Sequence, residues 1–232
     1  MKAFLLAAGL GTRLKPMTDD IPKCLVPICG TPLIYIWLEL IENAGIDEVL
    51  ISTHHFADKV RDKILQRKNK VKIKFYHESV LLGSGGSIAK NYDFVKNEDN
   101  FYILYADNLT NVKLKEIWEY HSKIDSIFTV YVYETDKPKE KGIFVANENG
   151  KAERFEEKPE NPESNLANSG IGVANKKIFD YFNNNLYIDF GKDVMTKFID
   201  RMYIMKTHDY IKDIGTMKDY WDAQTEWNRL NK

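Results

Sequence analysis

The fold of this chain is decided by residues 4–27, FLLAAGLGTRLKPMTDDIPKCLVP. The stretch opens with the apolar run Phe4 to Ala8, which is typical of a central parallel strand covered on both faces. Gly9 and Gly11 follow, and glycine lets the backbone turn sharply and pass close to a bound group. Because open α/β sheets bind ligands beyond the carboxyl ends of their strands, we expect a ligand-binding loop directly after this strand.

Strand and helix patterns alternate along the first half of the chain. Apolar runs predict strands near residues 49–53, 71–76 and 101–105, and helical spacing predicts helices near 33–44, 57–66 and 87–95. Short strand–helix–strand connections are right-handed and produce a parallel, doubly wound sheet. The sequence therefore predicts an α/β fold of the Rossmann-like type, with a mostly parallel mixed sheet flanked by helices.

The second half is richer in β-structure. Strands are expected near residues 126–133, 142–146, 151–155, 169–173 and 203–207, and helices near 176–183, 192–201 and 217–230. Asn149-Gly150 is a strong hairpin signal between two of these strands. Since no repeat or low-complexity linker divides the chain, we predict a single domain over residues 1–232. It has a nucleotide-binding half at about 1–110 and a small β-rich acceptor-binding half at about 111–232.

Composition excludes several kinds of partner. The 232 residues carry a net charge of −1, so no global positive field attracts nucleic acid, and any anion site must be built locally. No apolar run approaches the roughly 20 residues that cross a bilayer. Cys24 and Cys29 lack the spacing of a zinc knuckle or a redox CxxC pair, which favours a reduced, cytoplasmic protein. We expect a monomer or homodimer that binds neither nucleic acid nor membrane.

The glycine loop supplies the first candidate site. Its backbone amides, together with the side chains of Arg13 and Lys23, can bind the oxygens of a triphosphate. The spacing is neither GxGxxG, because Leu14 occupies the third glycine position, nor a Walker A sequence. On the glycines alone, an ordinary strand-to-helix turn with a solvated arginine accounts for the pattern as well.

A longer stretch of the sequence favours the ligand-binding interpretation over an ordinary turn. Residues 6–14, Pro16 and residues 22–27 closely resemble the signature of the sugar-1-phosphate nucleotidylyltransferases. Further elements resemble that family in the same order: Glu78 with residues 83–86, Asp107, residues 157–159, residues 168–171 and residues 213–216. The resemblance implies nucleotidylyl transfer from a nucleoside triphosphate to a sugar 1-phosphate, with release of pyrophosphate.

The resemblance also implies roles for individual residues. Asp107 and Asp213 are expected to hold Mg²⁺, and Arg13, Lys23 and Asp107 to act in catalysis. The expected nucleotide-binding residues are Leu6, Ala7, Ala8, Gly9, Gly11, Thr12, Arg13, Glu78, Gly83, Ser84 and Gly85. The expected sugar-phosphate-binding residues are Gly142, Glu157, Lys158, Asn168 and Gly170.

These residue types suit the chemistry. Phosphoryl-type transfer needs little covalent help, but it needs charge neutralised and the line of attack held. Carboxylates are hard oxygen ligands for Mg²⁺, while Arg13, Lys23 and Lys158 can neutralise the triphosphate and the acceptor phosphate. Since the attacking phosphate oxygen is already ionised, no general base is expected to be essential.

The nucleotide base is indicated only by Glu78 and residues 83–86, a weaker signal than the glycine loop. A carboxylate such as Glu78 can accept hydrogen bonds from the N1–H and 2-amino groups of guanine, whereas a pyrimidine would face it with carbonyl acceptors. Residues 83–86, GSGG, also resemble the corresponding element of the mannose- and heptose-1-phosphate guanylyltransferases, to which the chain is most similar within the family. GTP is therefore the favoured donor, with UTP, CTP and dTTP as alternatives.

Several positions depart from the commonest family pattern. Ala106-Asp107-Asn108 also resembles phosphocholine-type cytidylyltransferases, which keeps a non-sugar acceptor open. Gly172 is expected to widen the acceptor pocket. The chain shows no hexapeptide β-helix after the last predicted helix, so no second activity is expected.

Three alternative functions compete with the transferase. A nucleotide-sugar-binding regulatory subunit on the same fold would not need both aspartates. A glycosyltransferase would need an Asp-x-Asp motif after a strand, and a dinucleotide oxidoreductase an intact GxGxxG, and neither is in place. Taken singly, Asp107 and Asp213 could also be turn or helix caps, and Lys158 a solvated loop charge. The charged stretch 137–141 is expected to be an exposed loop.

Overall fold

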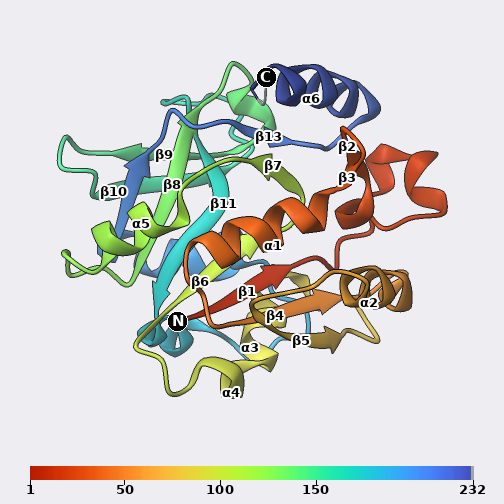
Figure 1. Cartoon of the computed structure of the whole chain (residues 1–232). Coiled ribbons are helices and arrows are strands. Elements are labelled where there is room, and N and C mark those ends of the chain that lie inside the picture. Colours follow the sequence, from red (N-terminus) through yellow and green to blue (C-terminus); the bar gives the residue numbers. More distant parts are fainter. Residues whose placement is uncertain (231–232) are drawn as a thin grey trace.

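A mixed nine-stranded sheet forms the centre of the protein in the computed structural model, which describes residues 1–230 (Figure 1). Its strands span Lys2–Leu6 (β1), Glu48–Thr53 (β4), Lys72–His77 (β5), Asn100–Tyr105 (β6), Phe128–Glu134 (β8), Gly142–Ala146 (β9), Ala152–Glu157 (β10), Leu166–Asn175 (β11) and Met202–Lys206 (β12). The order is β10-β9-β11-β6-β1-β4-β5. Outside this order, β8 pairs with β11, and β12 pairs with β8. The α/β fold with a mixed sheet is confirmed.

The parallel part of the sheet comes from the first half of the chain. β1 lies between β4 and β6 and is parallel to both, and β5 continues the parallel order beyond β4. Successive side chains of β1 enter opposite cores, with Phe4 on one face of the sheet and Ala3 and Leu5 on the other. The uninterrupted apolar run therefore reflects burial on both faces.

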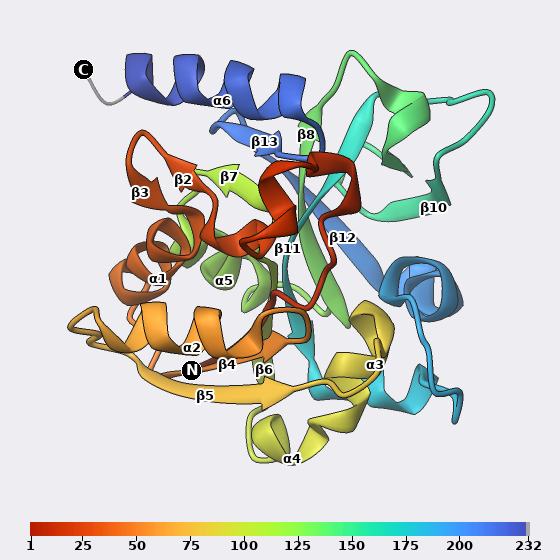
Figure 2. The same cartoon turned by 90° about the vertical axis from the view of Figure 1, so that its right-hand side faces the viewer.

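Helices pack on both faces of this parallel part (Figure 2). The helices span Leu33–Asn43 (α1), Ala57–Leu65 (α2), Gly83–Lys90 (α3), Tyr92–Val95 (α4), Leu114–His121 (α5) and Met217–Leu230 (α6). Apolar residues of α1, α2 and α5 join one core, and those of α3 and α4 join the other. None of the helices formed by residues 1–230 is long and apolar enough to cross a bilayer.

The antiparallel part comes from the second half. β11 runs antiparallel to β6 and joins the two parts, with β8 and β9 pairing along it. The register of its pairing with β8 shifts between Asn168 and Gly172. This shift marks a β-bulge at the end of the sheet where the glycine loop lies. A β-rich second half is thus present, as expected.

Several local predictions were wrong. The helix expected near 87–95 begins at Gly83 and is interrupted at Asn91, giving α3 and α4. The helices expected near 176–183 and 192–201 are 3-10 helix at Lys176–Tyr181, π-helix at Phe190–Val194 and 3-10 helix at Met195–Arg201. Helix α5 was not predicted at all.

Two short ribbons were also missed. β2 (Pro27–Ile28) pairs with β3 (Thr31–Pro32), and β7 (Asn108–Thr110) pairs antiparallel with β13 (Ile211–Asp213). The second ribbon joins the segment that follows β6 to the segment that follows β12.

Candidate functional site

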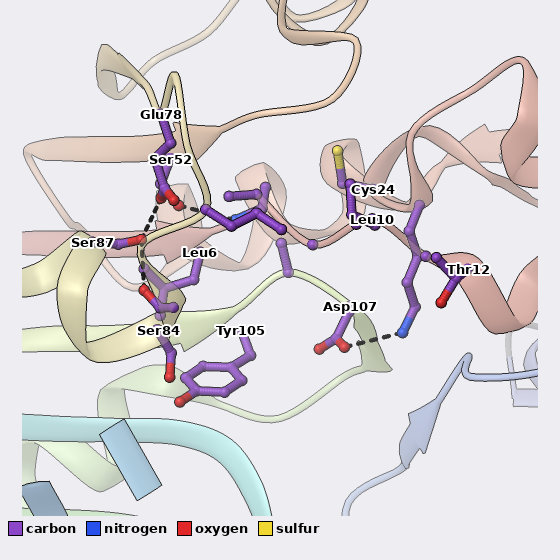
Figure 3. Close-up of a pocket in the computed structure, with 18 of the residues that line it drawn as sticks. Leu6, Leu10, Thr12, Cys24, Ser52, Glu78, Ser84, Ser87, Tyr105 and Asp107 are labelled. Carbon is purple, nitrogen blue, oxygen red and sulfur yellow. Dashed lines mark hydrogen bonds and ion pairs between the residues drawn. The ribbon is translucent and has the colours of Figure 1, made fainter. Parts of the chain in front are cut away.

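A cavity of about 510 Å³ lies where the parallel strands β1, β4 and β6 end (Figure 3). It is lined by residues of the glycine loop, of the segments after β5 and β6, and of the start of α3. All the predicted nucleotide-binding residues except Gly85 line it: Leu6, Ala7, Ala8, Gly9, Gly11, Thr12, Arg13, Glu78, Gly83 and Ser84. Lys23 and Asp107 line the same cavity.

The glycine loop is held in a folded-back shape. Gly11 has a left-handed φ of 63°, and its carbonyl oxygen accepts the Leu14 N–H at 2.9 Å and the Thr18 hydroxyl at 2.8 Å. A Cβ at Gly11 would lie only 3.2 Å from the Cβ of Lys23. The loop therefore needs glycine at this position and packs directly against the lysine predicted to act in catalysis.

Lys23, Asp107 and Asp213 form one ionic cluster. The Lys23 Nζ atom lies 3.0 Å from Asp107 Oδ2 and 3.2 Å from Asp213 Oδ1. Burial alone would lower the pKa of Lys23, which is 8% exposed, but the two carboxylates outweigh burial and raise its pKa above the ordinary value. For Asp213 burial acts in the opposite direction, and neighbouring lysines hold its pKa below the ordinary value.

The β7–β13 ribbon accounts for the meeting of two aspartates so distant in sequence. Asp213 is the residue opposite Asn108 in the ribbon, which places it beside Asp107. The Asp107 carbonyl accepts the Ile214 N–H at 3.4 Å, and Asn108 is anchored by its amide, which donates to the Ser169 carbonyl at 2.8 Å. The predicted convergence of the two aspartates is thus present in the structure.

Arg13 approaches the same cluster from the glycine loop. A Cβ added to Gly215 would lie 3.3 Å from Arg13 Nη2 and 3.2 Å from Asp213 Oδ2. The guanidinium group of Arg13 and the carboxylate of Asp213 therefore both lie close to Gly215. Arg13, Lys23 and Asp107 line the cavity, and Asp213 adjoins it through its contact with Lys23.

This donor set fits a single Mg²⁺ ion. The two carboxylates already converge on one cation, the Lys23 ammonium group, and both are oxygen donors of the kind Mg²⁺ prefers. Among residues 1–230 there is no cluster of three or more His, Cys, Asp or Glu side chains that could hold a metal. Two protein ligands are consistent with Mg²⁺, which keeps waters and binds substrate phosphates.

Glu78 differs from expectation in what its carboxylate contacts. The side chain is 1% exposed; Oε2 accepts the Leu82 N–H at 3.0 Å, and Oε1 accepts the Ser87 hydroxyl. Figure 3 shows Glu78 directed at Ser87 at the edge of the cavity. The carboxylate thereby ties the loop after β5 to helix α3.

The glycines of residues 83–86 serve a packing contact. A Cβ at Gly83 would lie 2.4 Å from the Ile188 carbonyl oxygen, and one at Gly85 would lie 2.7 Å from Ile188 Cγ2. The Gly85 and Gly86 N–H groups both donate to that Ile188 carbonyl, at 2.8 and 3.2 Å. Segment 186–190 is therefore docked closely on α3, and it brings Tyr187 and Asp189 into the cavity.

Part of the predicted acceptor set lies beside the cavity. Asn168 and Gly170 line an adjoining space of about 10 Å³, and Tyr105 lines both that space and the main cavity. The Asn168 side-chain oxygen accepts the Gly170 N–H at 2.8 Å, which stabilises the bulge of β11. Gly170 has a φ of 69°, and a Cβ there would lie 2.9 Å from the Tyr105 side chain.

Gly142, Glu157 and Lys158 lie farther out and line neither space. Gly142 pairs with Glu157, and a Cβ on Gly142 would lie 2.7 Å from the Glu157 carboxylate. Burial outweighs the neighbouring lysines and raises the pKa of Glu157. Lys158 is exposed and has a left-handed φ of 52°.

Two expectations about this region were wrong. Gly172 does not widen the acceptor pocket, because the Phe128 ring fills the space, and a Cβ there would lie 2.4 Å from that ring. Lys141 was expected in an exposed charged loop, but its side chain is 22% exposed and its Nζ lies 2.9 Å from Asp213 Oδ2.

Sequence reasoning missed several cavity residues. Ser52, Ser87, Tyr105 and Asp189 line the cavity but belong to no part of the predicted site. Tyr105 could have been found, because it ends the strand directly before Ala106 and Asp107. Asp189 gave no usable signal, since only its docking on α3 through Ile188 brings it to the site.

Comparison with known proteins places the chain among its relatives. A family model described as nucleotidyl transferase matches residues 2–229. A UTP–glucose-1-phosphate uridylyltransferase of Synechocystis sp. is 30% identical, with coverage of 96% of this chain and 62% of the relative. The mannose-1-phosphate guanylyltransferase catalytic subunit beta of Xenopus tropicalis is 27% identical, with coverage of 95% and 62%. The chain therefore spans about three fifths of the length of these curated relatives.

A solved structure agrees with this placement. HddC from Yersinia pseudotuberculosis superposes with a TM-score of 0.84 at 28% identity, over 97% of this chain and 99% of that chain. Its complex with GMP-PN gives a TM-score of 0.83 at the same identity and coverage. Because the family match extends over residues 2–229, and so includes the glycine loop and both aspartates of the cluster, the chain belongs to the nucleotidyl transferase family.

Proposed function

We propose that this protein transfers a nucleotidyl group from GTP to a sugar 1-phosphate of the mannose or heptose type, with Mg²⁺ as cofactor. The observation that carries the proposal is the meeting of Lys23, Asp107 and Asp213 beside a cavity lined by the glycine loop. Membership of the nucleotidyl transferase family supports the reaction class. Similarity to the frog guanylyltransferase and to HddC, which has been solved with GMP-PN, supports the guanine nucleotide.

The reaction is an in-line displacement at phosphorus. An acceptor phosphate oxygen forms a bond to the α-phosphorus, the bond from that phosphorus to the oxygen bridging the β-phosphorus breaks, and pyrophosphate leaves with the electron pair. The nucleophile is already an oxyanion, so proton removal is not needed at this step. Catalysis then depends on alignment and on neutralising the charges of two anionic substrates.

The nucleotide side of the site supplies the first part of that neutralisation. The loop after β1 would hold the triphosphate through backbone amides, with Arg13 on the departing phosphates. Lys23 would lie between the two substrates. Asp107 and Asp213 would hold Mg²⁺, which when bound neutralises phosphate charge and helps to fix the reacting oxygens.

The acceptor side would use the antiparallel part of the sheet. Lys158 would bind the acceptor phosphate and Glu157 a sugar hydroxyl, with Gly142 leaving room for the Glu157 carboxylate beside it. Asn168 and Gly170 would contact the sugar from the bulge of β11, next to the cavity. These assignments follow the family resemblance of the sequence motifs.

A second candidate has UTP as donor and a glucose phosphate as acceptor. It is favoured by the 30% identical uridylyltransferase of Synechocystis sp., and by Glu78, whose carboxylate oxygens already accept hydrogen bonds within the protein. A phosphocholine-like acceptor, or a regulatory subunit that only binds nucleotide sugars, are further outcomes that the same experiment separates.

The test is a substrate screen with detection of pyrophosphate. GTP, UTP, CTP and dTTP are each combined with mannose, heptose and glucose 1-phosphates and with phosphocholine, in the presence of Mg²⁺. We expect the highest kcat/KM for GTP with a mannose- or heptose-type acceptor. Binding of nucleotide by the folded protein without pyrophosphate release from any pair would contradict the proposal.

A variant connects the activity to the site. Asp107→Asn removes one predicted metal ligand, and we expect turnover to fall about 100-fold or more while the protein stays folded. The side chain of Asp107 is 46% exposed, so its loss leaves no buried vacancy. Asp125→Asn, at an exposed aspartate, serves as the matched control and should keep full activity.

A further inference from the structure

Lys141 adds a positive charge to the site and has no role in the reaction proposed above. Its Nζ atom lies 2.9 Å from Asp213 Oδ2, while the other oxygen of Asp213 contacts Lys23 at 3.2 Å. A half-buried ammonium group paired with a predicted metal ligand is unlike the exposed charges around it.

The backbone ties Lys141 to the predicted acceptor residues. Lys141 directly precedes β9, and its carbonyl accepts the Lys158 N–H at 2.9 Å, which extends the β9–β10 ladder beyond the Gly142–Glu157 pair. The side chain therefore starts from the hairpin that carries Glu157 and Lys158, and it ends at the carboxylate of Asp213.

Lys23 and Lys141 both form ion pairs with Asp213, but they approach it from different parts of the fold. Lys23 reaches the aspartates from the nucleotide side, after the glycine loop. Lys141 reaches Asp213 from the acceptor side, and its charge also acts on Glu157. The ammonium group of Lys141 thus lies between the hairpin that carries Glu157 and Lys158 and the carboxylate of Asp213.

We infer that Lys141 is a second ligand of the acceptor phosphate, which acts together with Lys158 and exchanges Asp213 for that phosphate when substrates bind. The inference rests on the proposed function. Two ammonium groups and two carboxylates balance each other in the free site, which comprises Lys23, Lys141, Asp107 and Asp213. When Asp107 and Asp213 serve a metal ion, the dianionic acceptor phosphate becomes the natural counter-charge for Lys141.

Steady-state kinetics of substituted proteins test this role. Lys141→Met keeps the aliphatic stem and removes the charge, Lys141→Arg keeps the charge, and Lys139→Met is the matched control at an exposed lysine of the same segment. The probes are GTP and mannose 1-phosphate, with the most active pair of the screen run in parallel. We expect Lys141→Met to raise the KM for the sugar phosphate by about 10-fold or more, since hydrogen bonds to charged groups are strong.

Three further readouts separate binding of acceptor from other roles. In Lys141→Met the KM for the nucleotide should stay within about twofold of the wild type, because the loop that binds it is untouched. Lys141→Arg should recover most of the acceptor affinity. If Lys141 only orients Asp213, the concentration of Mg²⁺ that gives half-maximal rate rises and the KM for the acceptor does not, which overturns the inference.

The experiment also distinguishes failure of the inference from failure of the proposed function. Wild-type turnover combined with an unchanged acceptor KM in Lys141→Met rejects the role of Lys141 alone. Absence of wild-type turnover with every pair rejects both. Thermal unfolding of each variant shows whether it is folded, and Lys141→Gln, which also removes the charge, carries the test if Lys141→Met is not folded.

Discussion

Gly83→Ala is the substitution that best separates two roles of the GSGG element. If these glycines serve nucleotide recognition, the change should weaken binding of the triphosphate and leave stability nearly unaltered. If they serve the contact with Ile188, the change should destabilise the protein. The structure favours the packing role, because the Cβ position of Gly83 is 2.4 Å from the backbone oxygen of Ile188.

The size of the loss can be worked from two contributions. Gly83 has a φ of 76°, and a non-glycine residue in the left-handed region costs about 1–2 kcal/mol. Overpacking a buried contact costs about 1–3 kcal/mol, and here the obstacle is backbone rather than the end of a flexible side chain. The sum is about 2–5 kcal/mol, which for a chain of this size corresponds to a fall in Tm of about 4–20 °C.

Gly9→Ala is the matched comparison. A Cβ at Gly9 meets nothing within 4 Å, and its φ lies outside the left-handed region. We therefore expect its free energy of unfolding to stay within about 0.5 kcal/mol of the wild type, as for a surface substitution. Equilibrium urea unfolding of wild type, Gly83→Ala and Gly9→Ala gives the three values directly.

One result would refute this reasoning. If Gly83→Ala retained the wild-type free energy of unfolding and lost only affinity for the nucleotide, the close packing of segment 186–190 on α3 would not be the reason for glycine there. If instead stability falls, the KM for the nucleotide should change as well, because the same segment carries Tyr187 and Asp189 into the cavity.

Two further predictions concern Glu78 and His121. Glu78→Gln leaves either the Leu82 N–H or the Ser87 hydroxyl without its carboxylate acceptor. We therefore expect the KM to rise about 3- to 10-fold for every triphosphate alike. A loss confined to GTP in the kinetic screen would show that Glu78 recognises guanine instead. His121 is 3% exposed, and burial lowers its pKa from 6.5 to about 4, so the unfolded chain takes up the proton first as pH falls. Stability is then fully present above about pH 6.5 and declines by about 3 kcal/mol toward pH 4. His121→Gln should lack this part of the decline in urea unfolding across that pH range, and a constant difference between the two proteins would contradict the assignment.

Local pattern was sufficient for the parallel half of the fold and for its loop. Continuous apolar runs predicted β1, β4 and β6 because strands buried on both faces carry no polar alternation. The glycine loop was predicted for a similar reason, since its shape is set by residues close in sequence, such as Gly11 and Thr18. The family resemblance then indicated which of the remaining residues to expect nearby.

Elsewhere the local pattern was misleading. Residues 192–201 have helical spacing, but Phe190–Val194 forms a π-helix and Met195–Arg201 a 3-10 helix, and both segments pack against β10. Gly172 was misjudged because the ring that fills its space comes from Phe128, on another strand. In both cases tertiary packing overrides what propensity suggests.

The opening stretch by itself determined the reaction class that we propose, since the strand, the glycine turn, Arg13 and Lys23 all lie within 24 residues of sequence. Only tertiary structure decided which charges share one site. The three-residue strands β7 and β13 are too short to show a period, yet their pairing sets Asp213 beside Asp107. Asp213 also contacts Lys141, which is 72 positions away in the sequence. Contacts of that kind depend on the whole sheet being assembled, and no pattern within either segment contains them.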